Sequence, residues 1–222
     1  KNILLIGIKL TFVKPMFRFI FFSMSILILS NCARTGRPEG GPKDEDAPLF
    51  IISKPPYKTI NFDKKEIELN FNEFIKLKDL NKQLIVSPPL KNPLLVTPQG
   101  SASKFLTLKI LDTLVKNTTY IINFGNAIED NNEGNKLESF KYVFSTGNYI
   151  DSLTTSGEVK DAYLDEKLKN TNVLLYKIDS SFNDSIVFKR KPNYVTNTLD
   201  TTRFNFSNLK EGKYLMIALK ET

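Results

Sequence analysis

The strongest constraint on the fold is an alternation of apolar and polar residues that recurs from residue 49 onward. In residues 66–72, Ile67, Leu69 and Phe71 lie on one side of an extended segment and polar residues on the other. Prolines punctuate the chain between such segments, and no amphipathic helical pattern intervenes, which favours an antiparallel β-sandwich over residues 49–147. Further strands of this first domain are predicted at residues 83–87, 94–97, 104–111, 119–124 and 140–144.

A second set of short apolar segments follows residues 148–156, which we interpret as a linker. Its strands are predicted at residues 157–162, 172–176, 186–188, 203–206 and 215–219. The chain is therefore predicted to be all-β, with two tandem antiparallel β-sandwiches at residues 49–147 and 157–222. Because the last strand runs almost to Thr222, we expect the second domain to be incomplete, which would leave an edge strand unpaired.

The N-terminal part contains an apolar run at residues 19–29, preceded by Arg18. Eleven residues are too few to cross about 30 Å of hydrocarbon, but they suit the core of a signal peptide. Met16 is the best start for such a signal, so residues 1–31 are interpreted as upstream sequence plus signal peptide. The run ends close to Cys32, the only cysteine of the chain.

The sequence Leu29-Ser30-Asn31-Cys32 resembles the lipobox of bacterial lipoproteins, although Asn31 stands where Gly or Ala is usual. The resemblance implies cleavage before Cys32 and attachment of lipid, such as palmitate, to that residue. A plain signal peptide or a buried thiol remains the alternative. Residues 32–48, rich in Gly, Pro and charge, are predicted to be a flexible tether.

The order of motifs in residues 49–147 resembles the bacterial Ig-like domain of surface-layer and envelope proteins. The segments that carry this resemblance are residues 53–56, 67–73, 114–120, 130–135 and 140–147. It implies a cell-envelope setting and transfers no catalytic residues. The pattern Phe-x-Phe-x-Asn-Leu-x-x-Gly-x-Tyr at residues 204–214 resembles transthyretin-like domains of the carboxypeptidase-regulatory type.

Composition limits the chemistry of the chain. It contains no His, which excludes Ser–His and Cys–His nucleophile systems, and we predict that it is not an enzyme and needs no cofactor. The formal charge is +7, but residues 1–31 hold four cations and no acid, so the rest carries 27 cations against 24 acids, a charge of +3. No basic stripe with interleaved aromatics stands out, and we expect no nucleic-acid binding.

Two further groups of residues are candidate sites. The segment 130–135 fails the spacing of an EF-hand, so a turn is the main interpretation, with Asp130, Asn132 and Glu133 as a weaker calcium candidate. An Asp-Ser/Thr-aliphatic pattern, which resembles a bacterial O-glycosylation acceptor, marks Thr113, Ser152 and Ser185.

Three functions remain open on the sequence. The favoured one is a non-catalytic envelope lipoprotein that acts as a spacer, docking or scaffold module with other outer-membrane proteins. The alternatives are a carbohydrate- or adhesion-type binding module, which exposed aromatics on one sheet face would favour, and the accessory part of an enzyme whose catalytic domain lies elsewhere. The location expected is the outer membrane, through the lipid anchor. The basic residues after Cys32 (Arg34 and Arg37) tilt it toward the periplasmic face.

Overall fold

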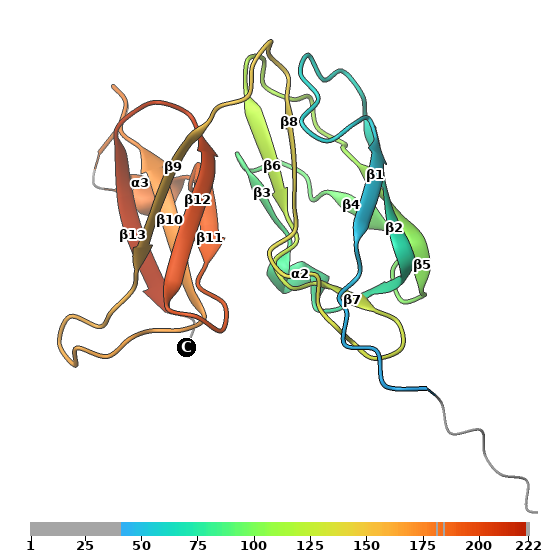
Figure 1. Ribbon diagram of the computed structural model, residues 1–222. Helices are drawn as coiled ribbons and strands as arrows, with labels where there is room; N and C mark the ends of the chain where they lie inside the picture. The colour runs from blue at the N-terminus through green and yellow to red at the C-terminus, as the bar shows by residue number, and fades with distance from the viewer. Residues whose placement is uncertain (1–40, 181, 184, 221–222) are drawn as a thin grey trace, which may run out of the picture. The chain divides into compact units, whose positions relative to one another are not determined.

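Nearly all secondary structure in the protein is β-strand, as the alternation predicts. The computed structural model describes residues 41–180, 182–183 and 185–220 (Figure 1). Within these residues, the strands form several antiparallel sheets that make up two sandwiches, and helix is confined to two single-turn segments. The predicted all-β class is therefore confirmed.

The first sandwich packs two sheets against each other. Its larger sheet has the strand order β1-β2-β5-β4, with β7 paired to the far end of β2, and its smaller sheet has the order β3-β6-β8. The short helix α2 (Leu80–Gln83) precedes β3. The strands are β1 (Phe50–Lys54), β2 (Glu66–Leu77), β3 (Ile85–Ser87), β4 (Leu95–Thr97), β5 (Ser103–Lys109), β6 (Thr119–Asn123), β7 (Ile128–Asp130) and β8 (Lys141–Ser145).

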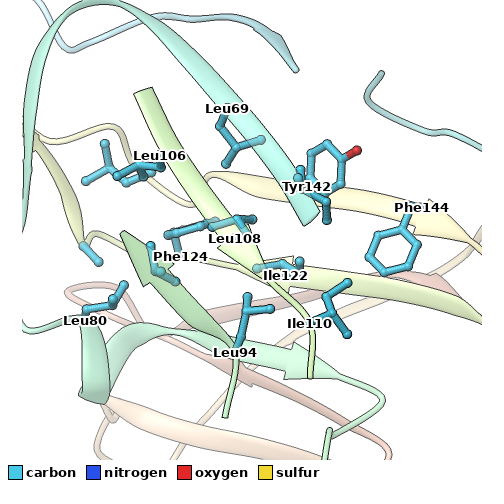
Figure 2. Packing of buried hydrophobic residues seen from close by; sticks show 14 of the residues in the cluster. Leu69, Leu80, Leu94, Leu106, Leu108, Ile110, Ile122, Phe124, Tyr142 and Phe144 are labelled. Carbon is cyan, nitrogen blue, oxygen red and sulfur yellow. The ribbon is translucent and has the colours of Figure 1, made fainter. Parts of the chain in front are cut away.

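The register of these strands places the alternating apolar residues in one core. Leu69 lies opposite Leu106 across β2 and β5, and Ile122 lies opposite Tyr142 across β6 and β8. Residues directly opposite in an antiparallel pair point to the same face, so each pair fills the interior together. Figure 2 shows these side chains converging with those of Leu108, Phe124 and their neighbours, all of them buried.

The second sandwich is smaller. One sheet has the order β11-β10-β13 and the other pairs β12 with β9. Its interior is formed by buried residues of β10, β11 and β12. The strands are β9 (Leu153–Glu158), β10 (Thr171–Lys177), β11 (Tyr194–Asn197), β12 (Arg203–Leu209) and β13 (Tyr214–Lys220).

A glycine in β9 allows a close contact with a ring of the second core. Gly157 pairs with Phe204 across β9 and β12. A Cβ atom added at Gly157 would lie 2.7 Å from Cζ of the Phe204 ring. The ring therefore occupies the space that any other residue at position 157 would need for its side chain.

The structure departs from the sequence expectations in three places. The predicted strand at 186–188 is wrong: these residues belong to the helix α3 (Ile186–Lys189), in which Ile186 is buried and Phe188 is exposed. An apolar run of three residues does not distinguish a strand from a helix, because it is too short to show a period of either 2 or 3.6 residues. Strand β9 begins at Leu153, inside the expected linker, and β1, β7 and β11 have no clear counterpart among the predicted strands.

Candidate functional site

The residues predicted to carry lipid lie outside the described residues. Cys32 and the preceding Leu29, Ser30 and Asn31 belong to residues 1–40. Lipid attachment at Cys32 therefore stays a prediction from the sequence. The helices among the described residues are single turns, and none of them could span a bilayer.

Asp130 organises the turn that follows β7. Its carboxylate accepts hydrogen bonds from the backbone N–H groups of Asn132, Glu133, Gly134 and Asn135, at 2.6 to 3.2 Å. Burial alone would raise the pKa of Asp130, but these four hydrogen bonds outweigh it and hold the pKa below its ordinary value.

The same hydrogen bonds bear on the calcium candidate. Both oxygens of Asp130 face backbone N–H donors, which carry partial positive charge, whereas a calcium ligand needs oxygens free to face a cation. Asn132 and Glu133 contribute their backbone amides to this turn. Among the described residues, no group of three or more acidic, His or Cys side chains could hold a metal ion.

The three glycosylation candidates differ in accessibility. Thr113 and Ser152 are exposed, whereas Ser185 is half-buried and its hydroxyl donates a hydrogen bond to Oδ1 of Asn183 at 2.6 Å. Asp112, which precedes Thr113, is buried and accepts hydrogen bonds from the backbone of Lys91 and Asn92. Asp112 therefore has a structural role that does not depend on whether Thr113 is glycosylated.

The outer face of the smaller sheet in the first sandwich carries an apolar patch that is not among the sites predicted from the sequence. Ile121 of β6 and Val143 of β8 are 7% and 1% exposed. They belong to the hydrophobic cluster of the second sandwich, together with Val173, Phe206 and Leu209. Their strand neighbours Tyr120, Ile122, Tyr142 and Phe144 point the other way, into the first core.

We call this region the junction: Ile121, Val143 and the hydrogen-bonded residues beside them. The backbone N–H of Asp151, in the connector between β8 and β9, donates to Oγ1 of Thr119 at 2.9 Å. The side-chain amide of Asn208 donates to the carbonyl oxygen of Asp151 at 2.9 Å. Asp44–Thr222 accordingly form one compact unit.

A signal for the junction was present in the sequence. Residues 120–122 and 142–144 are apolar at consecutive positions rather than at alternate ones. A strand of this kind is typical of burial on both faces. The sequence therefore marked β6 and β8 as doubly covered, but it did not say which residues would cover the second face.

Two exposed aromatic residues lie on neighbouring strands of the larger sheet. Phe74 of β2 is 54% exposed, and Phe105 of β5 is 48% exposed. Nζ of Lys104 lies 5.4 Å from the centre of the Phe74 ring, and Phe105 pairs across the strands with Asn70. Most other Phe and Tyr side chains of the first sandwich are in its core.

The comparisons with known proteins bear on the first sandwich. No curated protein matches the chain. The chain resembles the N-terminal part of the bacterial S-layer protein SbsC at 13% identity and a TM-score of 0.30, covering 79% of this chain and 44% of that one. This chain thus spans less than half the length of that structure. Residues 44–146 match the family model of the bacterial Ig-like domain, the family that the motif order of the first sandwich resembles.

Proposed function

We propose that this chain is a non-catalytic cell-envelope lipoprotein whose two sandwiches form a single spacer and docking module held to the outer membrane by lipid on Cys32. The junction is the observation that carries the spacer part of this proposal. Ile121 and Val143 would be a solvent-exposed apolar patch if the two sandwiches moved independently. A spacer must hold what it carries at a set position, and a junction with an apolar centre and buried hydrogen bonds suits that task.

The envelope setting has separate support. The match of residues 44–146 to a bacterial Ig-like domain fits an accessory role, since the motifs of that family contribute no catalytic group. The lipobox-like sequence ending at Cys32 would supply the anchor, and the residues between Cys32 and the compact unit that begins at Asp44 would act as the tether. The periplasmic face of the outer membrane remains the favoured location, on the basic residues that follow Cys32.

Metabolic labelling with a palmitate analogue tests the anchor. The wild-type chain should take up the label and sediment with the membranes, because the acyl chain transfers into the bilayer. Cys32→Ser should lose the label, and Asn31→Gly should keep it. Equal labelling of the wild type and Cys32→Ser would contradict the anchor.

Substitution within the junction tests the spacer. Ile121 points away from the first core, so Ile121→Asp should leave that core intact while it disfavours the packing against the second sandwich. We expect one thermal transition for the wild type and two for this variant. Val115→Asp, at a position 65% exposed, should behave as the wild type. A single unchanged transition in Ile121→Asp would contradict a coupled junction.

A second candidate function, carbohydrate binding, is favoured by the exposed pair Phe74 and Phe105. Flat sugar faces pack on exposed aromatic rings, and neighbouring amide side chains such as Asn70 supply hydrogen bonds. The two proposals are compatible, because this surface is on the larger sheet and the junction is on the smaller one.

A further inference from the structure

A polar cleft opens where the apolar part of the junction ends. Asn123 and Lys141 pair across β6 and β8, two positions along each strand from Ile121 and Val143, so all four residues share the outer face of the smaller sheet. From Asn123 and Lys141 the cleft extends to residues of the second sandwich, and its volume is about 1030 Å³. This volume is at the upper end of the range for pockets that bind small ligands, so several units of an oligomer would fit.

Carboxamide and hydroxyl side chains are the commonest kind in the wall of the cleft. Both sandwiches contribute carboxamides, which include Gln83, Asn123 and Asn126 from the first and Asn170, Asn197 and Asn205 from the second. Each carboxamide has a donor and an acceptor side by side, a pattern that binds the hydroxyl groups of a sugar. Few large apolar side chains line the cleft, and the one aromatic ring among them, Phe204, is buried in the second core.

Asn126 has a side chain that the fold leaves unsatisfied. The residue is only 9% exposed, and its backbone N–H donates to Oε1 of Gln83 at 2.7 Å. Its Oδ1 atom is buried and has no hydrogen-bond partner among the described residues. A buried polar atom without a partner lowers stability, so its presence calls for an explanation. Because Asn126 lines the cleft, a polar group of a ligand bound there would satisfy its side-chain amide.

Lys141 brings an unpaired positive charge to the same wall. Its side chain is half-buried, and burial lowers the pKa of its ammonium group. In the described part of the chain, no carboxylate lies within ion-pairing distance of this group. Glu158 also lines the cleft, but its carboxylate is engaged by Nζ of Lys167 at 2.8 Å. An ammonium group that is partly removed from water without a counter-ion favours an anionic ligand.

The other charged residues of the lining limit how anionic the ligand can be. Asp79, Glu138 and Asp200 are all exposed to solvent. Arg203, which lies on the wall that the second sandwich contributes, is exposed as well and has no acidic partner among residues 41–180, 182–183 and 185–220. Since the charges of the lining nearly balance, the cleft suits a mainly hydroxylated ligand with few carboxylates rather than a polyanion.

We propose that this cleft binds an oligosaccharide that carries a carboxylate, with the carboxylate at Lys141 and the sugar hydroxyls on the carboxamides around Asn126. A peptide would need apolar subsites for its side chains, and the wall offers few. The groups that lack partners are polar, so the cleft differs from an apolar face that further protein would cover. It shares no residue with the exposed pair Phe74 and Phe105, and it does not depend on the lipid anchor.

A glycan array that holds uronic-acid and sialic-acid oligosaccharides beside neutral ones of matched length tests this proposal with the full chain. The wild type should bind acidic members and not their neutral counterparts. Lys141→Gln should weaken binding tenfold or more, because a hydrogen bond to a charged group is lost. Lys141→Arg keeps the charge and should retain most of the binding. Lys64→Gln, at a side chain 64% exposed outside the cleft, should bind as the wild type does.

The melting temperature separates a role in binding from a role in folding. Lys141→Gln removes a half-buried charge without a counter-ion, so without glycan it should melt at or above the temperature of the wild type. A bound acidic glycan should raise the melting temperature of the wild type and not that of Lys141→Gln. The proposal is overturned if no acidic glycan binds, if neutral counterparts bind equally, if Lys141→Gln binds as tightly as the wild type, or if this variant melts below it.

Discussion

The backbone N–H of Asp151 donates a hydrogen bond to the hydroxyl oxygen of Thr119 across 2.9 Å, and both residues are buried. This contact ties the connector to the first strand of the β6–β8 pair, next to the apolar centre of the junction. A buried N–H that loses its acceptor has no water to replace it, so the contact is expected to matter for stability.

Replacing Thr119 by Val removes the acceptor while it keeps the shape of the side chain. We expect the free energy of unfolding to fall by about 1–3 kcal/mol, the usual cost of an unsatisfied buried group. Urea denaturation followed by circular dichroism measures this change. Thr119→Ser keeps the hydroxyl and should lose less, and an equal loss in both variants would show that the methyl group matters rather than the hydrogen bond.

Gly157→Ala tests the close contact in the second core. The added methyl would lie 2.7 Å from the Phe204 ring, which must then move out of a packed position. We expect a loss of about 1–3 kcal/mol, the typical cost of overpacking, seen as a lower urea midpoint. Gly41→Ala has no atom within 4 Å of the new Cβ and should leave the midpoint unchanged. A midpoint for Gly157→Ala equal to that of the wild type would contradict the packing described.

The hydrogen bonds of Asp130 are expected to make the stability of the fold depend on pH. The pKa of Asp130 is lowered in the folded chain, so its ionised form stabilises the fold above the ordinary pKa of an aspartate, and this stabilisation is lost as the pH falls through the lowered value. Asp130→Asn should therefore be less stable than the wild type at pH 7, by about 1–3 kcal/mol. The difference should shrink as the pH falls below about 4.

Asp63→Asn is the matched control for that pH series, because the side chain of Asp63 is 75% exposed. A stability gap between Asp130→Asn and the wild type that is constant from pH 7 to pH 2 would contradict the role given to the ionised carboxylate. Calcium should leave the melting temperature unchanged, since the oxygens of Asp130 already accept backbone hydrogen bonds.

Substitution of the exposed residues Phe74 and Phe105 tests carbohydrate binding. If the outer face of the larger sheet binds sugars, Phe105→Ala should weaken glycan binding by about tenfold or more, since stacking and burial of one ring contribute about 1–2 kcal/mol. A glycan array, followed by calorimetry on any hit, measures this. Tyr163→Ala, at a ring 93% exposed in the second sandwich, is the control. Binding that survives Phe105→Ala and Phe74→Ala unchanged would place the sugar site elsewhere.

The sequence was most informative about the fold where buried and exposed residues alternate along a strand. Ile67, Leu69 and Phe71 alternate with polar residues, and all three lie in the core of the first sandwich. Such a pattern works because successive side chains of a strand point to opposite faces, so half of them must find an apolar interior.

The sequence was least informative where long-range packing decides the outcome. Ile121 and Val143 lie in consecutive apolar runs that indicate burial on both faces, but only the folded chain shows that the second sandwich covers them. Phe74 and Phe105 have the residue type of core positions yet are exposed. Each directly precedes a buried residue of its strand (Ile75 and Leu106), so alternation rather than residue type gives the face that it occupies. Ile186–Lys189 forms a helical turn in which Ile186 is buried and Phe188 is exposed.

Purification of the tagged full-length chain from detergent-solubilised outer membranes tests the central claim most directly. A spacer and docking module should elute with at least one other envelope protein in a fixed ratio. Ile121→Asp, which disturbs the junction, should reduce that ratio, while Val115→Asp should not. Recovery of the wild-type chain without another envelope protein, at the same yield as Ile121→Asp, would contradict the proposed function.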